Sequence, residues 1–216
     1  KLEEIVDLVA LCHDYCDSKM VSEDKTLRVN KFIALIERFY PDKQGEEATL
    51  VADCIQSVGY KHLVDTSWTL PPNVANHEYF SKAYLIVQDA DLIDAIGAVG
   101  VARCFAFSGK RNRALFSPLT GCNFDEPLLN YKNNNSKGSS DVEADAAVGH
   151  FFEKLFRIPS MLRTETGRNM AIQRYKHMLD FMTALEIEIG ASLSEHDFKK
   201  LRCNLKMVVD DFQRTI

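Results

Sequence analysis

Apolar residues repeat every three or four positions along most of the chain, which is the spacing of an amphipathic α-helix. The pattern predicts helices over residues 2–19, 27–40, 46–58, 78–107, 142–156, 165–189 and 194–214. We find no alternating run long enough for a useful β-strand and no internal repeat of about 20–50 residues. The predicted fold is therefore a single all-α bundle.

Breaker residues separate these segments. Pro41 ends the second predicted helix and Gly59 the third, and Pro71 with Pro72 interrupts the pattern before the fourth. Residues 117–140 are mostly polar, which predicts a surface loop rather than a domain linker. The segment from Ser194 to Asp197 (SEHD) has the form of a capping box and predicts the start of the last helix.

The composition excludes some classes of protein. The chain has 216 residues, 46% of them hydrophobic, which is enough to bury a sizeable core. Its formal charge of −5 provides no basic field for general binding to nucleic acid or to an anionic membrane. The longest stretch without charged residues, 66–77, contains two prolines and is shorter than the about 20 residues of a membrane span. We expect a soluble protein with neither nucleic acid nor membrane as a partner.

The six cysteines include no C-x-x-C pair and are too sparse for a disulfide scaffold, so we interpret them as reduced thiols. No targeting segment is recognisable in the sequence. These two features favour a cytoplasmic location, with the nucleus as a further possibility.

Two groups of polar residues interrupt apolar helices. His13 and Asp14 follow an apolar run that predicts their burial, and imidazole with carboxylate is a good ligand pair for a divalent transition metal. The dipeptide alone is weak evidence, because His196-Asp197 repeats it at a solvated helix start. Asp89, Asp91 and Asp94 lie in a helix that we expect to be buried nearly all round; a cation nearby or a solvated polar stripe would each explain them. Gly97 to Gly100 are expected inside this helix, packing rather than binding phosphate.

Several segments resemble the HD-domain metal-dependent phosphohydrolase superfamily, in particular its bacterial nucleotide pyrophosphohydrolase-like branch. They are Leu8–Asp14 (LVALCHD), Asp17–Met20 (DSKM) and Ile86–Arg103 (IVQDADLIDAIGAVGVAR), followed by 150–154, 164–168 and 171–174. The likeness covers about residues 5–185. It implies an HD-type helical domain over 1–190, with 191–216 as a C-terminal helical extension packed on the same domain.

The resemblance implies metal ligands at His13, Asp14 and Asp91, with Asp89 and Asp94 as neighbouring acids. The metal is a divalent transition ion such as Mn, Fe, Co, Ni or Zn. A fourth ligand, an upstream histidine, is implied on a preceding helix, and because no histidine precedes His13 we expect the protein to extend before Lys1. Asp17 is implied as the catalytic carboxylate that orients the attacking water or deprotonates it as a general base; a solvated helix-end carboxylate is the alternative.

The family-like positions of Lys19, Arg103, His150 and Lys154 make them the expected substrate-binding residues, although His150 is as easily an ordinary packed histidine. The implied substrate is a small nucleotide, with cleavage of a nucleoside triphosphate to monophosphate and pyrophosphate preferred. A nucleoside 5′-monophosphatase of the same superfamily and a helical scaffold with a decayed HD site are the alternatives. The sequence leaves the oligomeric state open.

Overall fold

The computed structural model describes residues 1–15, 24–65, 67–116 and 146–215. Within these residues every regular element is a helix, which confirms the all-α prediction. The chain forms two compact units, Lys1–Asp91 and Leu92–Ile216, and helix α6 (Glu78–Asp94) contributes its last three residues to the second. Each unit is described by itself below.

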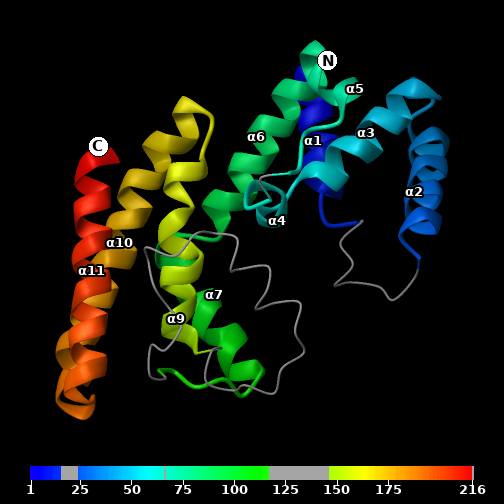
Figure 1. Ribbon diagram of the computed structural model, residues 1–216. Helices are drawn as coiled ribbons and strands as arrows, with labels where there is room; N and C mark the ends of the chain where they lie inside the picture. Colours follow the sequence, from blue (N-terminus) through cyan, green and yellow to red (C-terminus); the bar gives the residue numbers. More distant parts are fainter. Residues whose placement is uncertain (16–23, 66, 117–145, 216) are drawn as a thin grey trace. The chain divides into compact units, whose positions relative to one another are not determined.

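The first unit is built around helix α3 (Glu46–Ser57), against which α1 (Leu2–Cys12) and α2 (Lys25–Phe39) both pack (Figure 1). Two short helices, α4 (Tyr60–Leu63) and α5 (Pro72–Ala75), lead from α3 to α6. The Asp24 carboxylate caps α2 by accepting a 3.1 Å hydrogen bond from the Leu27 amide. Helix α3 is buried on most of its surface, and this places it at the centre of the unit.

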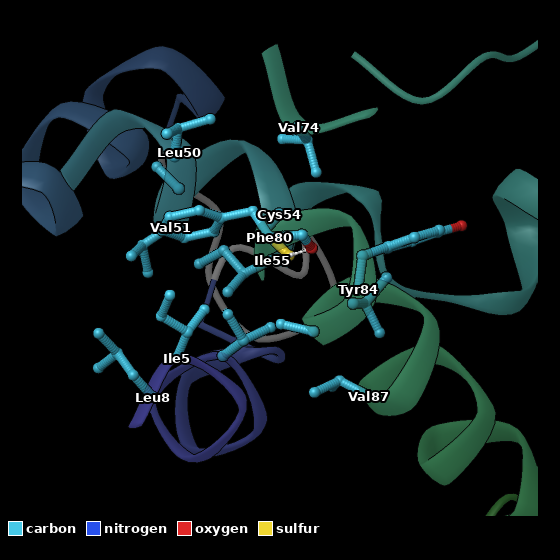
Figure 2. Packing of buried hydrophobic residues seen from close by; sticks show 14 of the residues in the cluster. Ile5, Leu8, Leu50, Val51, Cys54, Ile55, Val74, Phe80, Tyr84 and Val87 are labelled. Carbon is cyan, nitrogen blue, oxygen red and sulfur yellow. Dashed lines mark hydrogen bonds between the residues drawn. The ribbon is translucent and has the colours of Figure 1, made fainter. Parts of the chain in front are cut away.

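The core of the first unit joins α1, α3, α5 and α6 (Figure 2). The buried thiol of Cys54 in α3 contacts the Phe80 carbonyl oxygen of α6 at 3.9 Å, the interaction dashed in Figure 2. One core therefore holds both α1 and α6. The predicted metal ligands lie just after α1 and within α6. Its labelled members in Figure 2 are Ile5, Leu8, Leu50, Val51, Cys54, Ile55, Val74, Phe80, Tyr84 and Val87.

The second unit contains α7 (Gly97–Lys110), α9 (Ala147–Glu153), α10 (Glu165–Ile189) and α11 (Glu195–Thr215). Short 3₁₀ turns at Leu155–Arg157, Pro159–Met161 and Gly190–Ser192 connect them. Helix α10 packs against both α7 and α11, and α10 and α11 lie side by side in opposite directions (Figure 1). Helix α11 is the last helix that the sequence predicted, from residue 194. The assignment of 191–216 as an extension of the same domain stays a prediction.

The predicted capping box at the start of α11 is present. The Ser194 hydroxyl accepts a 3.1 Å hydrogen bond from the Asp197 amide and donates a 2.6 Å bond to the Asp197 carboxylate. The neighbouring His196 ring is exposed, as expected for a solvated helix start. This second His-Asp pair is therefore a structural cap, as predicted.

The helix predicted over 78–107 is in fact two helices, α6 and α7, bent by 65°. The break lies at Ala95 and Ile96, and Gly97 follows with φ +84°, a left-handed conformation that favours glycine. Gly97 is therefore the first residue of the second helix, and Gly100 lies in its first turn. Among the described helices, none alone is long and apolar enough to cross a membrane; only this bent pair meets that test, by length and composition.

Two other predicted helices are shorter than expected. The first ends at Cys12, with a turn over His13 to Tyr15, and residues 16–23 lie outside the described residues. The helix predicted from residue 142 is described only from Ala147 to Glu153, with 3₁₀ turns after it. The predicted loop at 117–140 also lies outside the described part of the chain.

Candidate metal centre

His13 lies in the turn that follows α1, and a hydrogen bond fixes its ring. Its Nδ1 is 2.7 Å from the Ala10 carbonyl oxygen. Because a carbonyl oxygen can only accept, Nδ1 donates this hydrogen bond, and Nε2 is the ring nitrogen left to face other groups. This arrangement is common for histidines that bind metals. Nε2 is 3.4 Å from Asp14 Oδ2 and 3.9 Å from Asp91 Oδ1.

The structure therefore brings together the three ligands that the family resemblance implied. Two donor atoms that bind one tetrahedral ion at about 2.1 Å lie about 3.4 Å from each other, so the distances from the imidazole suit a shared ion. One nitrogen and two carboxylates also suit a divalent transition metal in donor type. The described residues nonetheless contain no complete group of three His, Cys, Asp or Glu side chains placed to hold a metal. The three residues fit such a metal in donor type and in the two distances measured from His13 Nε2.

The exposure of these side chains corrects one expectation. The Asp14 side chain is 71% exposed, against 29% for His13 and 36% for Asp91. The preceding apolar run does not bury Asp14, because Leu11 near the end of α1 is itself 79% exposed and the core-facing residues of α1 end at Val9. The candidate centre is open to solvent on the Asp14 side.

The three acids of α6 lie in different surroundings. Asp89 is only 3% exposed, whereas the Asp94 side chain is 63% exposed. Next to Asp89, the buried Gln88 accepts a 2.9 Å hydrogen bond from the Gly59 amide, which ties α6 to the turn after α3. The expectation that this helix is buried nearly all round is wrong, since Ile86 is 41% exposed. Of these three acids, Asp91 is the one whose carboxylate is described near His13 Nε2, at 3.9 Å.

The remaining predicted residues are only partly described. Arg103 forms an exposed ion pair with Asp94 inside the second unit. The Lys154 amide caps α9 by donating to the His150 carbonyl oxygen at 3.1 Å, and both side chains are half-buried in that same unit. Their place relative to the metal ligands stays a prediction. Asp17 and Lys19 fall in residues 16–23, outside the described residues.

The contact made by Arg174 in α10 was not predicted from the sequence. Its guanidinium donates to the Ile93 carbonyl oxygen at 2.7 Å, at the end of the helix that carries the three acids. The family-like stretch at 171–174 contained this arginine, but helical spacing cannot show which carbonyl a long side chain reaches.

A comparison with known proteins found similarity to a bacterial protein. No protein-family model matches the chain. The uncharacterized protein YpgQ of Bacillus subtilis strain 168 is 28% identical over 185 residues, which covers 86% of this chain and 72% of YpgQ.

Solved structures agree with the helical architecture. The structure of YpgQ in complex with ADP matches with a TM-score of 0.56 at 28% identity, over 86% of this chain and 76% of that one. The Lin1889 protein of Listeria innocua matches with a TM-score of 0.55 at 27% identity, over 86% and 74% of the two chains. An HD-superfamily hydrolase of Bacillus thuringiensis has a TM-score of 0.55 at 24% identity, over 87% and 74%. The chain therefore has an HD-like all-α fold.

Proposed function

We propose that this protein is a metal-dependent phosphohydrolase that acts on a small nucleotide. The preferred reaction is hydrolysis of a nucleoside triphosphate to the monophosphate and pyrophosphate. The observation that carries the proposal is the gathering of His13, Asp14 and Asp91 around one imidazole nitrogen. The likeness to YpgQ, whose solved structure is a complex with ADP, and to an HD-superfamily hydrolase supports the substrate class and the fold.

In this proposal His13, Asp14 and Asp91 hold a divalent transition ion. Such an ion, when bound, lowers the pKa of water and polarises a phosphoryl oxygen. The hydrogen bond to Ala10 keeps His13 Nε2 directed toward the two carboxylates without rearrangement. The exposure of Asp14 leaves that side accessible to a substrate from solvent.

The other predicted residues complete the reaction. Asp17, a few residues beyond the His-Asp pair, takes a proton from the attacking water or orients it. Lys19, Arg103 and Lys154 balance the charge of the phosphates, and His150 contacts the substrate or supports its neighbours. Arg103 already binds a carboxylate, Asp94, and a phosphate group offers the same forked geometry to a guanidinium. The free thiols of the described cysteines support a cytoplasmic enzyme.

To test the proposal, metal binding and product formation are measured for the full-length wild-type protein and for its Asp91→Asn variant. We expect at least about 100-fold weaker binding of Mn²⁺ and a comparable loss of kcat/KM, because the change removes a ligand rather than a supporting group. Glu78→Gln is the matched control: it neutralises a carboxylate in the same helix, where Glu78 forms an exposed pair with Lys82 at 3.1 Å. Circular dichroism confirms that both variants keep their helices.

The products separate the proposed reaction from its alternatives. Nucleoside mono- and triphosphates are incubated with Mn²⁺, Co²⁺, Ni²⁺ or Zn²⁺, and phosphate and pyrophosphate are measured separately. Pyrophosphate from triphosphates supports the preferred reaction, whereas phosphate from monophosphates identifies a nucleoside 5′-monophosphatase. A wild-type protein that forms no product with any of these ions contradicts the proposal and favours the helical scaffold.

A further inference from the structure

The C-terminal end of α6 is electrostatically unfavourable by itself. The carbonyl groups that end a helix form the negative pole of its dipole, where carboxylates destabilise and cations stabilise. Helix α6 ends in Asp89, Asp91 and Asp94, and its own last turn contains no basic residue. The bend after Asp94 also removes amides that would continue the helical hydrogen bonds. Cations and hydrogen-bond donors from other elements therefore stabilise the end of α6, and Arg103 of α7 already pairs with Asp94 there.

Arg174 of α10 supplies both. Its Nη1 donates to the Ile93 carbonyl oxygen at 2.7 Å and to the Ile96 carbonyl oxygen at 3.5 Å. The Ile93 oxygen also accepts a 3.2 Å bond from the Ile96 amide, so the guanidinium adds a second partner at the last turn. All of these contacts lie within the second unit, to which the last three residues of α6 belong.

Gly97 makes room for this arginine. A Cβ atom added at Gly97 would lie 2.9 Å from Arg174 Cγ and 3.0 Å from Arg174 Cβ, closer than normal contacts. The same glycine has φ +84°, which starts α7 in its new direction. The bend is therefore built jointly by a glycine without a side chain and by an arginine whose stem lies over it. If Arg174 only filled space, its guanidinium would not need to lie against the carbonyl oxygens of Ile93 and Ile96.

We propose that Arg174 is a positioning residue that holds the last turn of α6 and thereby sets the place of Asp91. This inference rests on the proposed function, because it gives Asp91 the role of a metal ligand. Asp91 precedes Ile93 by two residues in the same helix. A last turn that is held in place therefore also fixes the backbone of Asp91. No contact between the guanidinium and the carboxylate is required.

The experiment compares Arg174→Met with Arg168→Met in the full-length protein. Methionine keeps an unbranched stem over Gly97 but removes the charge and the donors. Arg168 is the matched control, because it lies in the same helix and donates to two main-chain carbonyls, those of Leu162 at 3.3 Å and Arg163 at 2.9 Å, away from α6. Two quantities are measured: amide hydrogen exchange of the peptide covering residues 89–97, and the Kd for Mn²⁺.

We expect Arg174→Met to weaken Mn²⁺ binding by about 10- to 100-fold, as loss of a residue that orients a ligand does. Exchange over 89–97 becomes at least about 10-fold faster, because the last turn opens more often. Arg168→Met keeps the wild-type values of both. Arg174→Lys retains the charge without the planar fork and gives intermediate values, which also provides a test if Arg174→Met does not fold.

Wild-type exchange over 89–97 or wild-type Mn²⁺ affinity in Arg174→Met overturns the inference. Equal losses in Arg174→Met and Arg168→Met also overturn it, since they would show a general effect on α10. If the wild-type protein binds no Mn²⁺, the proposed function fails instead. The exchange measurement then decides by itself whether Arg174 holds the end of α6: unchanged rates refute that role and faster rates support it.

Discussion

At the break between α6 and α7, the backbone of Gly100 lies close to the carbonyl group of Ala95. Replacement of Gly100 by alanine tests whether this close approach is required. An added Cβ atom would lie 2.3 Å from the Ala95 carbonyl oxygen and 2.7 Å from its carbonyl carbon. Both neighbours are backbone atoms, so a change of side-chain rotamer cannot relieve the contact. The backbone at the bend must move by about 1 Å to restore normal van der Waals distances.

Two opposing terms set the size of the effect. Overpacking of this kind costs about 1–3 kcal/mol, and a rigid backbone neighbour favours the upper end. Alanine in place of glycine inside a helix raises the free energy of unfolding by about 1 kcal/mol through its higher helix propensity. We therefore expect Gly100→Ala to lower the free energy of unfolding by about 1–2 kcal/mol, and Tm by about 2–8 °C for a chain of this size.

Gly109→Ala is the internal control, because Gly109 lies in the same helix and a Cβ there meets nothing within 4 Å among the described residues. We expect this variant to gain about 0.5–1 kcal/mol from helix propensity alone. Urea denaturation followed by far-UV circular dichroism measures both variants. Equal stabilities for Gly100→Ala and Gly109→Ala would refute the argument that the bend requires a close approach at Gly100.

Two further predictions concern pH. Burial raises the pKa of the Cys54 thiol to about 12 and that of Cys104 to about 11, from 9.0 when unfolded. The unfolded chain alone then loses these protons just above pH 9.0, so stability falls as the pH rises from there toward the folded-state values. We expect a shallower fall for Cys54→Ala in urea midpoints measured across this range, and a slope equal to wild type would contradict the burial argument. Burial, with the charge of Lys61, lowers the pKa of His62 below 6.5, so its folded form stays neutral and stability falls as the pH drops below 6.5. His62→Gln should reduce this loss of stability below pH 6.5 in the same assay. If the loss is as large as in the wild type, His62 is not its source.

The helical pattern could be predicted because burial of one helix face imposes a spacing that the sequence displays directly. Helices α2, α3 and α10 begin and end within a few residues of the predicted positions, where prolines, glycines and caps mark their ends. The capping box at Ser194 was equally predictable, since its hydrogen bonds join residues three positions apart.

The bend after Asp94 was not predicted, although Gly97 and Gly100 were visible. An apolar rhythm continues across residues 95–96, and glycine inside a helical pattern is as compatible with close helix packing as with a break. The deciding contacts involve Arg174, which lies far along the chain from Ile93. The exposure of Asp14 was missed for a related reason, because an apolar neighbour in sequence does not ensure burial in the fold.

The sequence by itself determined the helical class, the helix faces and the chemical types of the candidate metal ligands, since each depends on residue identity and short spacing. Tertiary structure alone decided that His13, in the turn after α1, meets Asp91 of α6, with Nε2 and Oδ1 3.9 Å apart. It also decided that Arg174 of α10 reaches the Ile93 carbonyl oxygen. Both depend on a core and on side-chain contacts between distant parts of the chain, where small shifts of whole helices change which polar atoms meet.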